Sequence, residues 1–229
     1  ALEILKNMSH RGATGSDPET GDGAGIQIQI PHEFFFSELE KMDILLPCEG
    51  DYAVGMTFLP MEPNARYYCE GVFERILREE GQKIIGWRHV PINDKACGVS
   101  AQGTRPVIQQ IFIDKNDQEV KEFERKLYIV RKRVERTISE SLRPYTDAFY
   151  VCSLSTSTIV YKGQFLAHQI EEFYLDLKDD KLKSSIAIVH QRYSTNTFPS
   201  WRLAHPYRHI SHNGEINTIR GNVKWMNAR

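Results

Sequence analysis

Three segments of the 229-residue sequence carry more glycine, charged and hydroxyl residues than a buried core requires. They are SHRGATGSDPETGDGAGI at residues 9–26, HQRYSTNTFP at residues 190–199 and AHPYRHISHNGEIN at residues 204–217. Such side chains can hold a polar substrate, stabilise a developing negative charge or bind a metal ion. We therefore expect the chemistry of the chain in these segments.

Arg192 is a candidate carboxylate receptor. It follows the apolar run Ile186–Val189, which we expect to form a buried strand, so its guanidinium would emerge at the strand end beside Ser194 and Thr195. The planar guanidinium matches the two oxygens of a carboxylate. An arginine that caps a turn is the simpler alternative, and the residues by themselves leave both open.

The dipeptide Asn213-Gly214 also has two interpretations. Asn-Gly commonly forms a tight turn, because both residues tolerate positive φ. Alternatively, the side-chain amide of Asn213 and the backbone N–H of Gly214 converge as the two donors of an oxyanion hole. The residues that follow, Glu215–Asn217, are not those expected of a plain two-residue hairpin.

The glycines of the first segment could indicate a phosphate-binding loop, and the histidines of the third segment could indicate a metal site. No strand precedes Gly21 and no Lys-Ser/Thr follows the last glycine, so we expect a turn with close backbone approach rather than a phosphate loop. His205, His209 and His212 lie within eight residues, but no acidic or cysteine ligand accompanies them in a metal-like spacing. We predict no metal site.

The elements that must position these segments follow from hydrophobic periodicity. Strands are expected at residues 24–31, 52–59, 83–90, 106–113, 147–154, 158–161 and 184–192, and helices at 1–8, 32–42, 64–80, 117–142, 169–177 and 219–229. The strands at 147–154 and 158–161 are predicted to form a hairpin around residues 155–157. The charged stretch Glu119–Arg136 is expected to be a solvated helix face. Hairpins beside long helices indicate an α+β fold of layered sheets covered by helices.

Composition limits the classes of partner. Lys and Arg total 29 and Asp and Glu total 30, a formal charge of −1 that argues against a nucleic-acid or membrane partner. No apolar run approaches the roughly 18 residues of a membrane span. The four cysteines are widely spaced and form no C-x-x-C pair, which fits a reducing, cytosol-like compartment rather than a disulfide framework or a zinc site.

The motifs together resemble a known family. The strings HRGA, GDGAGI, H-x-R-x-S-T-N and HNGEIN resemble the glutaminase domain of class II glutamine amidotransferases, which are N-terminal-nucleophile hydrolases. The longer strings LKNMSHRGATGSDPETGDGAGI, RYSTNTFPSW and HNGEINTIRGNVKWM are similar to glutamate synthase large subunits, and the resemblance covers residues 1–229. It implies one domain with a four-layer α/β/β/α sandwich, truncated at both ends.

The resemblance also implies roles for individual residues. Arg192 would bind the α-carboxylate of L-glutamine, Thr195 would add a hydroxyl, and Arg11 would support the site. Asn213 and Gly214 would form the oxyanion hole. In that family an N-terminal cysteine attacks the side-chain amide, with its own α-amine as the base, and ammonia leaves. This cysteine is expected upstream of Ala1 and an acidic substrate ligand beyond Arg229, so the chain alone is expected to be inactive.

For the parent protein, the resemblance implies transfer of the ammonia to 2-oxoglutarate in the remaining synthase domains, which would carry FMN and an iron–sulfur cluster. No cofactor is expected in this chain. A small NAD(P)H-oxidising subunit is a further expected partner. The expected location is the cytoplasm, or the plastid in a plant or alga. Two alternatives stay open: a degenerate, non-catalytic glutamine-binding regulatory module, and a sugar- or purine-forming amidotransferase, which the GDG insertion and NTFPSW disfavour.

Overall fold

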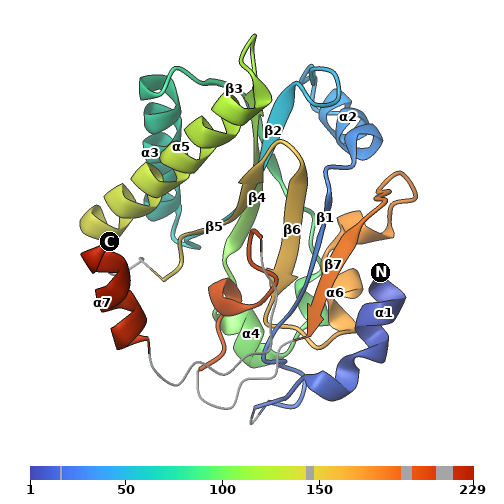
Figure 1. Ribbon diagram of the computed structural model, residues 1–229. Coiled ribbons are helices and arrows are strands. Elements are labelled where there is room, and N and C mark those ends of the chain that lie inside the picture. The colour runs from blue at the N-terminus through green and yellow to red at the C-terminus, as the bar shows by residue number, and fades with distance from the viewer. Residues whose placement is uncertain (16, 143–146, 192–197, 210–218) are drawn as a thin grey trace.

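The computed structural model describes residues 1–15, 17–142, 147–191, 198–209 and 219–229. Within these residues two antiparallel sheets lie between flanking helices (Figure 1). One sheet has three strands in the order β6-β1-β7, and the other has four in the order β3-β4-β2-β5. Helices and antiparallel sheets thus coexist as layers, and the α+β class predicted from the sequence is confirmed.

The strands are β1 (Ala24–Gln29), β2 (Tyr52–Leu59), β3 (Lys83–His89), β4 (Val107–Asp114), β5 (Tyr150–Ser155), β6 (Thr158–Gly163) and β7 (Ala187–Gln191). The helices are α1 (Leu2–Asn7), α2 (His32–Glu40), α3 (Pro63–Glu79), α4 (Val99–Gly103), α5 (Val120–Ser141), α6 (Gln169–Phe173) and α7 (Arg220–Ala228). Short 3-10 helices are η1 (Ser9–Arg11), η2 (Asp94–Ala96), η4 (Leu175–Lys178) and η5 (Trp201–Leu203). Most bounds lie within a few residues of those expected, whereas α4 was not predicted.

Helices α3 and α5 cover one face of the four-stranded sheet (Figure 1). Each helix packs an apolar face against the sheet, and on α5 the buried residues recur every three to four positions, which is the period of a helix. The buried residues of α5 are Phe123, Leu127, Val130, Val134 and Ile138. Its other faces carry charges, and Arg133 pairs with Glu80 of the neighbouring helix end at 2.6 Å. The prediction of a solvated charged face for this stretch is confirmed.

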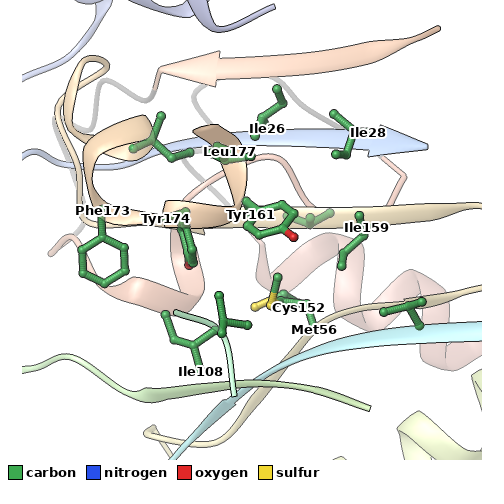
Figure 2. Close-up of a cluster of buried hydrophobic side chains, with 14 of the residues drawn as sticks. Ile26, Ile28, Met56, Ile108, Cys152, Ile159, Tyr161, Phe173, Tyr174 and Leu177 are labelled. Carbon is green, nitrogen blue, oxygen red and sulfur yellow. The ribbon is translucent and has the colours of Figure 1, made fainter. Parts of the chain in front are cut away.

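A second apolar cluster lies between the two sheets, and Figure 2 shows part of it. Adjacent strands β1 and β6 contribute pairs in register, Ile26 opposite Tyr161 and Ile28 opposite Ile159. The four-stranded sheet contributes Met56, Ile108 and Cys152. Phe173 ends α6, Tyr174 follows it, and Leu177 lies in η4. Because these side chains are almost completely buried, they fix the separation of the sheets.

A buried cluster of charges joins four elements at one side of this core. Arg88 of β3 donates two hydrogen bonds to the carboxylate of Asp176 in η4, at 2.9 and 2.8 Å. It also donates to Glu38 of α2 at 2.5 Å, and Tyr161 of β6 donates to Asp176 at 3.1 Å. The side chains of Arg88 and Asp176 are 4% and 1% exposed. Burial raises the pKa of Tyr161 well above its ordinary value, so its hydroxyl stays a donor.

The hairpin predicted around residues 155–157 is wrong. β5 pairs with β2, whereas β6 pairs with β1, so the turn carries the chain from one sheet to the other. Alternation of apolar and polar residues identifies a strand but does not name its hydrogen-bonding partner. The single helix expected at residues 169–177 is likewise divided into α6 and η4.

The burial expected for Ile186–Val189 is also wrong in part. Ile186 is 66% exposed and Ile188 is 39% exposed, whereas the polar residues His190 and Gln191 are buried. Within the described part of the chain, β7 pairs only with β1 and forms an edge of its sheet. The prediction of a strand at this position is therefore confirmed by β7, but the prediction that Ile186 and Ile188 are buried in the core is wrong.

Candidate functional site

All three polar segments reach the same end of the three-stranded sheet. Ala24, near the end of the first segment, pairs with Gly163 of β6 and with Gln191 of β7. Gln191 belongs to the second segment, so these two segments meet directly. The third segment crosses β1 at the next residue, Gly25, where an added Cβ would lie 2.2 Å from the carbonyl oxygen of His205.

The first segment leaves this end of the sheet as a narrow loop and returns to it. Thr14 and Gly21 form an isolated bridge, and the backbone N–H of Asp22 donates to the carbonyl of Ala13 at 3.0 Å. The main chain approaches its neighbours too closely for side chains, since a Cβ on Gly21 would lie 2.2 Å from the carbonyl carbon of Phe165. Gly23 has a φ of 142°, which favours glycine. The predicted close-approach turn is confirmed.

The outer part of this loop is tied to α4. The carboxylate of Asp17 accepts hydrogen bonds from the hydroxyl of Thr20 at 2.7 Å and from the backbone N–H of Ser100 at 3.0 Å. These donors, the Ser100 N–H foremost, hold the pKa of Asp17 below its usual value. A Cβ on Gly98 would lie 2.4 Å from the Thr20 hydroxyl, so this glycine permits the contact.

Arg11 lies at the rim of the same region. It ends η1, its side chain is exposed, and its backbone N–H donates to the carbonyl of Met8 at 2.8 Å. The next residue, Gly12, touches β7: a Cβ there would lie 2.2 Å from Nε2 of Gln191. Gln191 is fully buried, and its side chain has no hydrogen-bond partner among the residues that the structure describes. The structure thus places Arg11 beside the strand that leads into Arg192, without testing its predicted role.

The third segment is packed on β1 and β7 before it reaches the His-Asn-Gly motif. The rings of His190 and His205 stack with their centroids 4.5 Å apart, and the Tyr207 ring lies 4.2 Å from that of His205. Nε2 of Gln27 donates to the carbonyl of Arg208 at 2.8 Å. This packing gives His190 and His205 a structural role, because it fixes residues 205–208 on the sheet.

Lys162 of β6 is a contributor that sequence reasoning missed. It is completely buried and donates to the carbonyl oxygens of Arg202 at 2.9 Å and Ala204 at 2.8 Å. The available signal was a single lysine in the otherwise apolar strand sequence TIVYKG. A charged residue on a buried strand requires partners and is therefore worth noting even without a motif.

Four of the predicted site residues, Arg192, Thr195, Asn213 and Gly214, lie outside the described residues. Their roles in binding glutamine and in stabilising the oxyanion therefore stay predictions. The structure does describe the chain next to each pair: Gln191 directly precedes Arg192, and His209 stands four positions before Asn213.

Three of the four cysteines are buried thiols, poorly suited to act as nucleophiles. All four are free, and burial raises the pKa of Cys69 and Cys152 to about 12 and that of Cys97 to about 11. A thiol with a raised pKa carries little of the reactive thiolate. Cys48 is exposed. Across the described ranges, no group of three or more His, Cys, Asp and Glu residues could hold a metal ion, and no helix is long and apolar enough to cross a membrane.

Comparison with known proteins gives a match over the whole chain. The family described as class-II glutamine amidotransferases matches residues 1–229. The glutamate synthase [NADPH] large chains of Bacillus subtilis and Azospirillum brasilense are 45% and 46% identical over 231 and 229 residues, covering 100% and 99% of this chain. The chloroplastic ferredoxin-dependent glutamate synthase of Oryza sativa is 43% identical over 230 residues, again 100% of the chain. The chain spans only 14–15% of the length of these relatives.

Proposed function

Because the chain belongs to the class-II glutamine amidotransferases, we propose that it is the glutamine-hydrolysing domain of a glutamate synthase large chain. Members of this family have the α/β/β/α sandwich of the N-terminal-nucleophile hydrolases, the fold that the sequence resemblance implied. The observation that carries the proposal is the convergence of three motif segments at one end of the three-stranded sheet, where Gln191 pairs with Ala24 and His205 stacks on His190.

In this proposal the motif residues divide the work on L-glutamine. Arg192 binds the α-carboxylate with its planar guanidinium, and Thr195 adds a hydroxyl. Asn213 and the backbone N–H of Gly214 stabilise the negative oxygen that develops on the side-chain amide carbon. Arg11, exposed beside the end of β7, supports the rim of the site.

The reaction begins with a nucleophile that we place upstream of Ala1. A cysteine thiolate attacks the amide carbon, ammonia leaves, and water hydrolyses the thioester to glutamate. The ammonia passes to 2-oxoglutarate in the other synthase domains of the parent chain. Those domains would carry the FMN and the iron–sulfur cluster, fed in some forms by a small NAD(P)H-oxidising subunit. The protein would work in the cytoplasm, or in the plastid of a plant or alga.

The decisive experiment compares this chain with its full-length parent. The gene upstream of codon 1 is sequenced, and ammonia release from glutamine is measured for residues 1–229 and for the parent protein. We expect an upstream cysteine at the mature N-terminus, activity in the parent and none in residues 1–229, because loss of the nucleophile disables a group of residues that act as a unit. A complete parent without that cysteine would instead establish the regulatory alternative.

A further inference from the structure

Lys162 is a charged side chain inside the protein core. It lies on β6, is 0% exposed, and stands directly opposite Gly25 in the ladder with β1. Removing an ammonium group from water is costly unless polar partners surround it. The contacts of the Lys162 ammonium group therefore indicate its structural role.

Among the described residues, two partners of Lys162, Ala204 and Tyr207, belong to the third polar segment, and Arg202 lies just before it. Nζ donates to the carbonyl oxygens of Arg202 and Ala204, and it lies 4.7 Å from the centroid of the Tyr207 ring. The centroid of the Tyr150 ring, on β5, lies 4.6 Å from the same Nζ. Cation–π contacts of this kind strengthen when the cation is desolvated. One side chain thus holds the main chain at two alternate residues and an aromatic ring a few positions later.

The same stretch is also held from β1. An added Cβ on Gly25 would lie 2.2 Å from the carbonyl oxygen of His205 and 2.9 Å from Cδ of Pro206, so residues 205–206 rest on bare main chain. Gln27 donates to the carbonyl of Arg208. Lys162, Gly25 and Gln27 together form a seat, hereafter the loop seat, for residues 202–208.

Arg208 fastens the far end of the stretch to the rest of the fold. Its guanidinium donates to the carbonyl of Val151 at 2.7 Å and to Glu135 of α5 at 3.0 Å, and it lies over the ring of Tyr150 at 5.0 Å. Residues 202–208 are therefore fixed at both ends. Asn213 follows five positions after Arg208, so the loop seat fixes the chain from which the proposed oxyanion donors extend.

We propose that Lys162 is a positioning residue for glutamine hydrolysis, acting through residues 202–208 on Asn213 and Gly214. The inference rests on the proposed function. An oxyanion donor is effective only at hydrogen-bond distance, about 2.7–3.1 Å, from the position that the developing negative oxygen occupies, and a displacement of about 1 Å can lower a rate roughly a hundredfold. Loss of the seat should therefore lower kcat more than it raises KM, because the substrate carboxylate is held by a different residue.

The test uses the full-length parent protein and three variants. Lys162→Met removes the charge and both hydrogen bonds at similar length, and Tyr207→Leu weakens the same seat at a partly exposed position. Arg88→Met is the matched control, because Arg88 is buried and charged but contacts Glu38, Gln110 and Asp176 instead of this segment. Glutamine kcat and KM, glutamate synthesis with ammonium supplied directly, and thermal unfolding are measured for each variant.

We expect glutamine kcat to fall about tenfold to a hundredfold in Lys162→Met, with a smaller fall in Tyr207→Leu and little change in KM. Ammonium-dependent synthesis should be unchanged. Arg88→Met should lower the unfolding temperature while the folded enzyme keeps its glutamine kcat. If Lys162→Met does not fold, Tyr207→Leu alone decides the question. Unchanged kcat in the folded seat variants overturns the inference, whereas absence of glutamine-dependent activity in the wild type overturns the proposed function itself.

Discussion

Asp176 is the acceptor at the centre of the buried charge cluster, and its replacement by alanine should strongly destabilise the chain. The variant leaves Arg88 without the two hydrogen bonds at 2.9 and 2.8 Å and leaves the hydroxyl of Tyr161 without its acceptor at 3.1 Å. Arg88 is 4% exposed, so water cannot replace these contacts without disturbing the core. The guanidinium would keep Glu38 and Gln110 as partners.

The magnitude follows from the cost of leaving a buried charge incompletely paired. Breaking such a pair from one side costs about 3–5 kcal/mol, and the remaining contact with Glu38 places the expected value near the lower end, about 3 kcal/mol. For a domain of this size, each kcal/mol shifts the midpoint of thermal unfolding by roughly 2–4 °C. We therefore expect the free energy of unfolding to fall by about 3 kcal/mol and the midpoint by roughly 6–12 °C.

Equilibrium urea unfolding of residues 1–229, followed by circular dichroism, measures this change. Asp51→Ala is the matched control, because Asp51 pairs with Lys115 at 2.8 Å while its side chain is 51% exposed. An exposed pair contributes less than about 1 kcal/mol. The double variant Arg88→Met/Asp176→Leu should recover part of the loss, since no unpaired guanidinium remains. Equal losses in Asp176→Ala and Asp51→Ala would refute the account of the cluster.

Three further variants test substrate binding, catalysis and pH dependence. In the full-length parent, Arg192→Lys should raise the glutamine KM, because lysine keeps the charge but loses the two-pronged geometry of the guanidinium. Asn213→Ala should lower kcat by roughly a hundredfold or more, about 3 kcal/mol of barrier. Steady-state kinetics with glutamine and with ammonium test both variants, and a KM effect alone from Asn213→Ala would show that the roles are misassigned. Burial raises the pKa of Glu38, but hydrogen bonds from Lys41 and Arg88 outweigh it and hold this pKa below its usual value. The ionised Glu38 carboxylate therefore stabilises the fold above its unfolded pKa of about 4.3, and this contribution is lost as the pH falls through its pKa in the folded state. Urea midpoints measured from pH 6 to pH 3 should accordingly fall less steeply in Glu38→Gln than in the wild type.

Much of the local structure could be read from the sequence. The strand at Tyr52–Leu59 has the predicted bounds, and the helix expected at residues 64–80 spans Pro63–Glu79. Gly21 and Gly23 hold the close approach that their spacing predicted. The motif strings indicated the family over all 229 residues, and the family match agrees. These features depend on short-range periodicity, backbone sterics or the order of residues in a motif, all of which are present in the linear sequence.

Contacts between distant parts of the chain could not be read in this way. Sequence alternation found β5 and β6, but only the folded chain places them in different sheets. The sequence gives no sign that Arg88 meets Asp176, 88 positions later, or that Lys162 holds the carbonyl of Ala204. A local pattern determines which element forms and which face is apolar. Strand pairing and the pairing of buried charges depend on how distant elements pack together. The free energies of these contacts arise only in the folded chain, so a local sequence pattern does not predict them.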